Sequence, residues 1–194
     1  QIAREVRAEL KSQIAAYKEQ GLLAPKLTVI LVGEDPASQI YVNNKAKACG
    51  WIGMESETIR MSEDTTEEEL LRVIAEQNAD PAVNGILVQM PLPAGLNEDR
   101  VLLAIDPAKD VDGFHPMNVG RMAVGDSEAL VSCTPAGVIE LLKRSGISIS
   151  GKRCVVAGRS NIVGKPMARL LLAENGTVTV CHSRTSNMDE ILQE

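Results

Sequence analysis

Residues 27–32, Leu-Thr-Val-Ile-Leu-Val, form an almost uninterrupted apolar run. Such a run is expected of a strand that is buried on both faces of a parallel sheet. An amphipathic helix pattern, with apolar residues every three to four positions, precedes it from Ile2 to Tyr17. A turn at residues 33–36 follows it and leads into a helix from Ala37 to Cys49. We therefore expect an α/β protein built on a buried parallel sheet.

Strand and helix patterns continue to alternate along the chain. The patterns predict strands at 55–61 and 85–90 and helices at 65–78 and 97–105. The second of these strands ends at Gln89 and Met90, just before a proline pair. Because open α/β sheets bind ligands at the carboxyl ends of their strands, Gln89 is a candidate binding residue. The alternative is an amide that only bonds the local backbone.

Composition excludes several classes of protein. Hydrophobic residues make up 44% and charged residues 24%, which indicates a soluble globular chain, and no apolar run approaches the roughly 20 residues that span a bilayer. A formal charge of −6 argues against a broad nucleic-acid surface. No signal peptide is visible. Because the first residues already read as helix, a missing N-terminal segment stays an open alternative.

Cysteines and histidines do not form a metal-binding pattern. There is no CxxC pair, and the four cysteines lie far apart, at Cys49, Cys133, Cys154 and Cys181. Only His115 and His182 are available to join them. We therefore expect no metal. We also expect buried free thiols in a reducing cytoplasm.

Residues 106–116 contain two prolines, a glycine and three aspartates, a composition typical of an ordered loop. Loops of this kind often carry function, which makes Asp112 a candidate. The alternative is that Asp110 and Asp112 only cap turns. For His115, which precedes Pro116, we expect a structural hydrogen bond rather than catalysis.

After residue 130 we expect a second domain, which is of the nucleotide-binding type. The chain is thereby divided into domains 1–130 and 131–194. The first helix of the second domain is predicted to have Thr134 as N-cap and Pro135 at the first helical position, and to stop near Gly146. A strand (154–157), a glycine-containing turn, a helix (167–174) and a strand (177–181) follow. This order is that of the nucleotide-binding half of a doubly wound fold.

Gly158 and Gly164 lie in that turn. Their small size would let the backbone approach a pyrophosphate, whose charge is met by amides at the helix N-terminus. The second strand ends before Ser183 and Arg184, where NAD-selective folds usually have an acidic residue. Together with Arg159, these two residues indicate a pocket for the 2′-phosphate of NADP. The alternative is that they are basic and polar residues solvated at a strand end.

Tyr41 and Lys45 are four positions apart on the helix that follows the first strand, so they share one face. A lysine acts as a base near neutral pH only when its surroundings disfavour the charged form. A stacking ring beside such an amine would begin an active site. The alternative is a surface helix with a solvated lysine and a half-buried tyrosine.

Six motifs then occur in a fixed order: YVNNK, GILVQMPLP, DVDGFHPMNVG, CTPAG, GRSNIVGKP and CHSRT. With these motifs in this order, the chain resembles the bifunctional methylenetetrahydrofolate dehydrogenase / methenyltetrahydrofolate cyclohydrolase family over essentially its whole length. The resemblance implies a catalytic α/β domain joined to a Rossmann-type NADP-binding domain, with folate bound in the cleft between them. Family members continue well beyond the second nucleotide-binding strand, so we expect the Rossmann-type domain to be incomplete in this chain.

The resemblance also implies roles for individual residues. Lys45 would be the general acid/base of the cyclohydrolase step, with Gln89 bonded to it. Tyr41 would stack on the folate ring, and Asp112 would hold the pterin through its ring nitrogens. The remaining implied contacts are Val88 and Met90 for the substrate and Gly158, Arg159, Ser160 and Ser183 for NADP, to which the residue pattern adds Arg184.

The implied activity is NADP-dependent oxidation of 5,10-methylenetetrahydrofolate followed by hydrolysis to 10-formyltetrahydrofolate. This reaction belongs to one-carbon metabolism and serves purine biosynthesis. The resemblance further implies a cytoplasmic homodimer that acts on tetrahydrofolate derivatives. Two alternatives stay open: a monofunctional dehydrogenase, and a folate- or nucleotide-binding fragment without catalysis.

Overall fold

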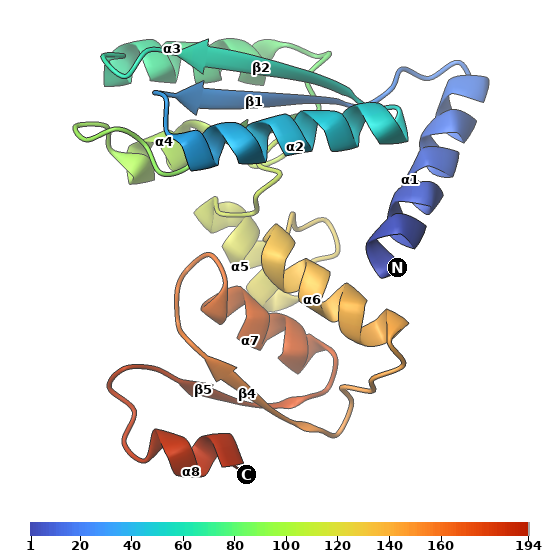
Figure 1. Ribbon diagram of the computed structural model, residues 1–194, viewed down its shortest axis with the longest axis vertical. Helices are drawn as coiled ribbons and strands as arrows, with labels where there is room; N and C mark the ends of the chain where they lie inside the picture. Colours follow the sequence, from blue (N-terminus) through green and yellow to red (C-terminus); the bar gives the residue numbers. More distant parts are fainter. Residues whose placement is uncertain (194) are drawn as a thin grey trace. The chain divides into compact units, whose positions relative to one another are not determined.

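A computed structural model describes residues 1–193, which form two compact α/β units (Figure 1). The first unit is Gln1–Val111 and the second begins at Asp112. Both contain parallel strands flanked by helices, which confirms the fold class expected from the sequence. No helix in this described part of the chain combines the length and the apolar character that crossing a membrane requires. The boundary between the two functional domains, which the sequence places after residue 130, stays a prediction.

The first unit is organised around a three-stranded parallel sheet of order β2-β1-β3. Its strands are β1 (Lys26–Val32), β2 (Glu55–Met61) and β3 (Gly85–Val88), and its helices are α1 (Ile2–Glu19), α2 (Pro36–Ile52), α3 (Glu67–Ala79) and α4 (Glu98–Ala104). Central strand β1 places Ile30 opposite Ile59 of β2 and Val88 of β3. All three carboxyl ends therefore lie at the same edge of the sheet.

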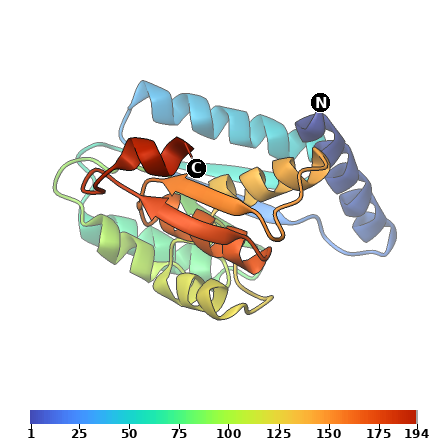
Figure 2. The same ribbon diagram turned by 90° about the horizontal axis from the view of Figure 1, so that it is seen from below.

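Strand β1 is buried on both faces, as its apolar run predicts. Ile30 and Val32 pack into a core with α3 and α4, whereas Val29 and Leu31 pack with Val42 of α2. Helix α2 and the pair α3 and α4 lie on opposite sides of the strands (Figure 2). The carboxyl end of the sheet is thereby left as the place where polar side chains can gather.

Lys109 fixes the segment that leads out of the first unit. Its ammonium donates three hydrogen bonds, of 3.0, 2.8 and 2.7 Å, to the backbone carbonyls of Gln77, Asn78 and Asp80 at the end of α3. Those carbonyls are acceptors that a helix terminus leaves without an intrahelical partner. Asp110 then forms a parallel bridge with Ile86 of β3. The chain entering Asp112 is therefore held to the sheet on one side and to α3 on the other.

The second unit contains a parallel pair of strands, β4 (Arg153–Ala157) and β5 (Thr177–Cys181), in which Ala157 lies opposite Cys181. Its helices are α5 (Pro116–Val124), α6 (Cys133–Arg144), α7 (Gly164–Ala173) and α8 (Met188–Gln193). The core of this unit joins Val156 of β4 to side chains from α6, α7 and the loop before β4. The strand, turn, helix and strand expected from the sequence are confirmed.

Three details differ from the expectations. Helix α6 begins at Cys133 with Ser132 as N-cap, so the assignments of Thr134 to the cap and Pro135 to the first position are wrong. Pro135 is tolerated because amides of the first turn have no intrahelical acceptor. Cys133 is exposed and Cys154 is half-buried, contrary to the expected burial of the thiols, whereas Cys49 and Cys181 are buried. The sequence patterns also missed the short helices α5 and α8.

Candidate active site

Lys45 and Gln89 are brought together from positions 44 residues apart. The Lys45 ammonium nitrogen donates a 3.1 Å hydrogen bond to the Gln89 side-chain oxygen. Gln89 follows β3 directly, and its backbone N–H donates to the carbonyl of Ile30 at 2.9 Å. It therefore stands at the carboxyl edge of the sheet, where the sequence predicted a binding residue.

The Gln89 amide is fixed at both ends. Its nitrogen donates to the backbone carbonyl of Met90 at 2.7 Å, so its oxygen faces Lys45. The alternative interpretation of Gln89, a bond to the local backbone, is thus confirmed, and its binding of a ligand stays a prediction. Because the amide oxygen accepts an N–H of Lys45, the lone pair of a neutral Lys45 amine is not used by this contact.

Tyr41 lies one turn before Lys45 on α2 and is 60% exposed, which leaves its ring accessible for stacking. The neighbouring Val42 is buried in the core and so fixes the rotation of the helix. Val88 is also a core side chain, and Met90 is half-buried against the same core. A substrate contact at Val88 would therefore have to use its backbone.

Helix α2, which carries Tyr41 and Lys45, starts at a side-chain cap. The Asp35 carboxylate accepts a 2.7 Å hydrogen bond from the backbone N–H of Ser38, and Pro36 occupies the first turn. This backbone bond, with a smaller contribution from the Ser38 side chain, lowers the pKa of Asp35.

The lowered pKa gives a prediction for acid stability. A carboxyl whose pKa is lower in the folded state stabilises the fold above its unfolded pKa, and this contribution is lost as the pH falls through the folded pKa. We expect Asp35→Ala to reduce the thermal midpoint at pH 7 and to reduce it much less below pH 3. Melting curves of both proteins across that range measure the difference. A deficit independent of pH would contradict an ionised cap.

Asp112 opens the second unit in a half-buried turn before α5. The next residue, Gly113, has φ +66°, and a Cβ there would lie 2.7 Å from backbone atoms of Leu130, Val131 and Ser132. The backbone beside Asp112 is therefore packed directly on that segment. His115 caps α5 by accepting a 3.1 Å hydrogen bond from the backbone N–H of Met117, which confirms its expected structural role.

The residues predicted to contact NADP lie at one edge of the β4 and β5 pair. The backbone N–H of Gly158, just after β4, donates to the carbonyl of Cys181 at the end of β5 at 2.7 Å. Arg159 and Ser160 follow Gly158, and Ser183 and Arg184 follow β5; all four are exposed. Adjacent parallel strands thus bring the two predicted segments together.

The two glycines of the turn have different tasks. Gly158 has φ +129°, a conformation that favours glycine, and open space where a Cβ would point. At Gly164 a Cβ would lie 2.4 Å from the carbonyl oxygen of Gly158. Gly164 therefore allows the start of α7 to pack directly on the turn, while Gly158 leaves room for a ligand to approach.

Both segments of this edge are shaped by side-chain hydrogen bonds that the sequence analysis missed. The Ser160 hydroxyl oxygen accepts from the backbone N–H groups of Val163 and Gly164, at 3.2 and 3.3 Å. After β5, the backbone N–H of His182 donates to the Thr185 hydroxyl at 2.8 Å, which closes a tight turn around Ser183 and Arg184. The available signal was a hydroxyl residue within each turn, since Ser and Thr side chains hydrogen-bond to nearby backbone groups there.

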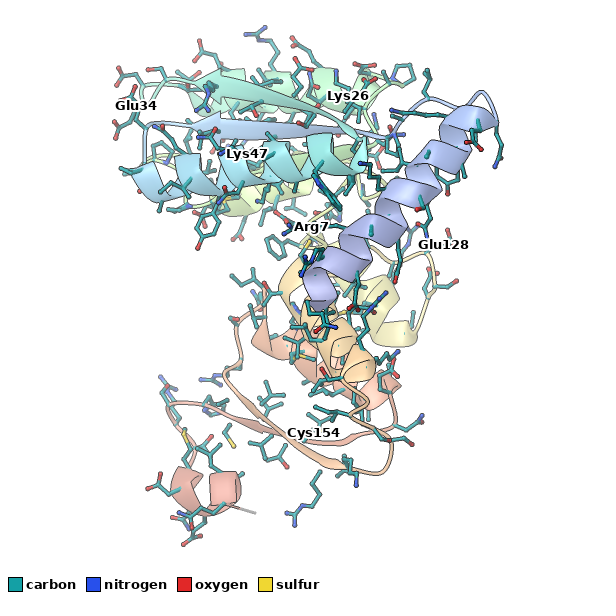
Figure 3. All side chains as sticks on the ribbon, turned by 45° about the vertical axis from the view of Figure 1, so that its right-hand side comes forward. Arg7, Lys26, Glu34, Lys47, Glu128 and Cys154 are labelled. Carbon is teal, nitrogen blue, oxygen red and sulfur yellow. The ribbon has the colours of Figure 1, made fainter. Side chains whose placement is uncertain are left out.

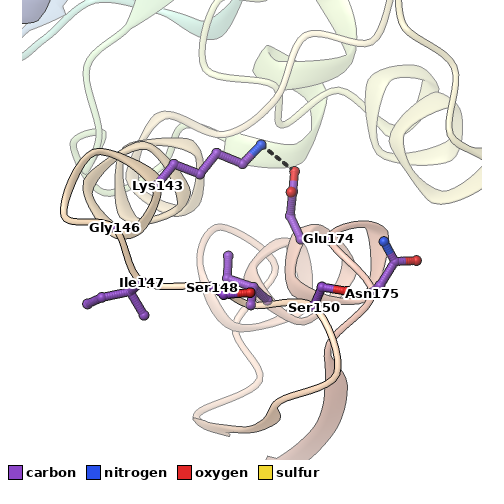
Figure 4. A pocket seen from close by; sticks show the side chains of 8 residues that line it. Lys143, Gly146, Ile147, Ser148, Ser150, Glu174 and Asn175 are labelled. Carbon is purple, nitrogen blue, oxygen red and sulfur yellow. Dashed lines mark hydrogen bonds and ion pairs between the residues drawn. The ribbon is translucent and has the colours of Figure 1, made fainter.

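An open hollow in the second unit lies apart from these residues (Figure 4). Lys143 and Glu174 form a 2.6 Å ion pair beside it. The residues that line it are Lys143, Gly146, Ile147, Ser148, Ile149, Ser150, Glu174 and Asn175. Because its lysine and glutamate neutralise each other, it offers little charge to an anionic ligand. Within residues 1–193, no group of three or more potential metal ligands occurs.

Models of known protein families match most of the chain in two parts. A family model described as tetrahydrofolate dehydrogenase/cyclohydrolase, catalytic domain, matches residues 1–112, and the NAD(P)-binding domain of the same family matches residues 132–194. The bifunctional protein FolD of Acetivibrio thermocellus is 56% identical over 98% of this chain and 66% of its own length. That of Brevibacillus brevis is 54% identical over 100% and 68%, so the chain spans about two thirds of these relatives.

Solved structures give the same result. The bifunctional FolD enzyme of Campylobacter jejuni has a TM-score of 0.92 and 46% identity, covering 95% of this chain and 65% of its own. The Trypanosoma brucei dehydrogenase-cyclohydrolase, solved with NADP cofactor and inhibitor, has a TM-score of 0.90 and 36% identity, covering 99% and 65%. The NAD-dependent enzyme of Saccharomyces cerevisiae scores 0.79 at 25% identity, covering 93% and 61%.

Proposed function

Because the chain belongs to the tetrahydrofolate dehydrogenase/cyclohydrolase family, we propose that it oxidises 5,10-methylenetetrahydrofolate with NADP⁺ and hydrolyses the 5,10-methenyl product to 10-formyltetrahydrofolate. The observation that carries this proposal is the hydrogen bond between Lys45 and Gln89 at the carboxyl edge of a parallel sheet. An amine held by an oriented amide beside an accessible tyrosine fits both folate binding and proton transfer.

In the hydrolytic step Lys45 acts as general base and then as general acid. It takes a proton from the water that adds to the methenyl carbon. As the bond between that carbon and N5 breaks, Lys45 returns a proton to N5, and the remaining hydroxyl proton leaves as the formyl carbonyl forms. Gln89 keeps the amine in place throughout, because its own amide is anchored to the backbone at Met90.

In the oxidative step the protein mainly binds and orients. Tyr41 stacks on the folate ring from its exposed position on α2, and Asp112 accepts hydrogen bonds from pterin nitrogens. When bound, NADP⁺ supplies the acceptor for the hydride that leaves the methylene carbon. Binding energy spent on this alignment accelerates a transfer that needs no acid or base at the reacting carbon.

The residues at the β4 and β5 edge fit NADP. The space beside Gly158 admits a pyrophosphate close to the backbone, and the positive end of the α7 dipole lies at this turn. Arg159 and Arg184 are exposed cations near Ser183, which suits the dianionic 2′-phosphate. An NAD-selective site would instead present a carboxylate to the ribose hydroxyls.

A spectroscopic assay tests the proposal. Purified protein is incubated with methylenetetrahydrofolate and either NADP⁺ or NAD⁺, and separately with methenyltetrahydrofolate alone. We expect faster reduction of NADP⁺ than of NAD⁺, and hydrolysis of the methenyl compound without any dinucleotide. Dehydrogenation without hydrolysis would indicate a monofunctional enzyme. A folded protein that catalyses neither reaction would be a binding protein instead.

We further propose that the protein works as a homodimer in the cytoplasm and provides 10-formyltetrahydrofolate as a formyl donor for purine biosynthesis. The family resemblance of the motifs supports the dimer. The chemistry of the product supports the metabolic role, since a formyl group on N10 is activated for transfer to an amine.

A further inference from the structure

The Ser132 hydroxyl makes a hydrogen bond that the place of this residue in the sequence does not explain. It is the N-cap residue of α6, yet its side chain makes no cap hydrogen bond. Its hydroxyl instead donates a 2.6 Å hydrogen bond to the backbone carbonyl of Ile162, 30 residues further along. Ser132 is only 4% exposed, whereas Ile162 is 49% exposed, so this hydrogen bond is partly buried. A buried hydroxyl that gives up its local capping role indicates that the distant contact matters.

The Ile162 carbonyl lies outside helix α7, which begins at Gly164 with Val163 as N-cap. A carbonyl that precedes the N-cap has no intrahelical donor, so it needs a partner from elsewhere. The neighbouring amides are used elsewhere: Lys165 donates to the carbonyl of Ser160 at 3.0 Å, and Met167 donates to that of Val163 at 2.8 Å. The Ser132 hydroxyl supplies a donor for the Ile162 carbonyl.

Two contacts therefore converge on residues 130–132. Gly113, next to Asp112, packs with its backbone against this segment, at a distance that leaves no room for a Cβ. From the same segment, Ser132 reaches Ile162 in the turn that runs from Gly158 to Gly164. The loop that carries the proposed pterin ligand and the turn that carries the proposed NADP contacts are thus joined through one short stretch of chain.

We propose that Ser132 is a positioning residue for the dehydrogenase reaction: its hydroxyl sets the turn 158–164 relative to the loop that carries Asp112. This inference rests on the proposed function. The hydrolytic step uses no dinucleotide, and the contact of Gly113 with residues 130–132 is made by backbone, so neither depends on the hydroxyl. Loss of the hydroxyl frees the turn and leaves the folate loop in place.

The test compares Ser132→Ala with its parent. Removing the donor of this partly buried hydrogen bond leaves the Ile162 carbonyl without the Ser132 hydroxyl, so we expect the Kd for NADP⁺, measured by calorimetry, to rise about tenfold. The dehydrogenase KM for NADP⁺ should rise in parallel, while kcat and KM for methenyltetrahydrofolate hydrolysis stay unchanged. Ser145→Ala, at the exposed end of the same helix, is the matched control and should bind NADP⁺ as the parent does.

Ser132→Cys gives a second, nearly isosteric variant with a weaker donor, and its NADP⁺ affinity should fall between those of the serine and alanine proteins. Unchanged Kd in Ser132→Ala, or hydrolysis that declines together with dehydrogenation, would overturn the assignment. A parent protein that neither binds NADP⁺ nor oxidises the substrate would instead overturn the proposed function. The two failures are therefore distinguishable.

Discussion

Lys45→Met is expected to lose methenyltetrahydrofolate hydrolysis by a factor of about 10²–10⁴, the usual contribution of a positioned general acid/base. Methionine retains much of the length of lysine but can neither take nor return a proton. The partner side chain stays oriented, because Gln89 remains bonded to the carbonyl of Met90. Hydride transfer depends on the alignment of folate and dinucleotide rather than on a proton, so dehydrogenation should decline much less.

Steady-state rates of both reactions, measured on the same preparation, check this division. Lys47→Met is the matched control: Lys47 lies two residues further along α2, is exposed (Figure 3), and should tolerate the change in both assays. Equal residual rates for the two reactions in Lys45→Met would contradict a role for Lys45 in the water step alone. They would point to a loss of folate binding, which a raised KM in both assays would reveal.

The parts of the site that sequence could predict are those fixed by short-range rules. The apolar run of β1 places α2 on one face of the sheet, and the spacing of Tyr41 and Lys45 then puts both on one side of that helix. The end of β3 places Gln89 at the edge where ligands bind. Once a parallel sheet is assumed, the meeting of Lys45 with Gln89 follows from topology.

The contacts that sequence could not predict join segments with no common pattern. The sequence pattern placed the cap of α6 at Thr134, and only the fold shows that the Ser132 hydroxyl donates to the carbonyl of Ile162. Nothing was predicted for the side chain of Lys109, which donates to three carbonyls at the end of α3. In both cases the partner is a backbone carbonyl at the end of an element. Carbonyls carry no residue-type signal, so the pairing is invisible until the elements are packed.

The two glycines of the turn between β4 and α7 also have roles that the sequence could not distinguish. From sequence, Gly158 and Gly164 have the same interpretation, as sites of close approach to a phosphate. The structure separates them: the absent Cβ of Gly158 points into open space, and that of Gly164 would point into the backbone of Gly158 itself. Gly164 is required by the packing of the helix on the turn, whereas Gly158 leaves open the space in which we propose that the dinucleotide binds.

Gly164→Ala should therefore strongly destabilise the second unit. The added Cβ would lie 2.4 Å from the carbonyl oxygen of Gly158 and 2.8 Å from the Cα of Arg159. Backbone atoms cannot rotate away as a side chain can, so α7 or the turn must shift. We expect the free energy of unfolding to fall by about 3 kcal/mol, the upper part of the range for overpacking, and the Kd for NADP⁺ to rise at least about tenfold.

Urea unfolding and calorimetric titration with NADP⁺ measure these two effects. Gly137→Ala is the matched control: Gly137 lies within α6 with no atom near its missing Cβ, so alanine should raise stability by about 0.5–1 kcal/mol through helix propensity. Opposite signs for one chemical change at two glycines of the same unit would show that close approach, not flexibility, explains Gly164. If Gly164→Ala bound NADP⁺ as tightly as its parent, the turn would accommodate a Cβ, and its geometry would not set the affinity for the dinucleotide.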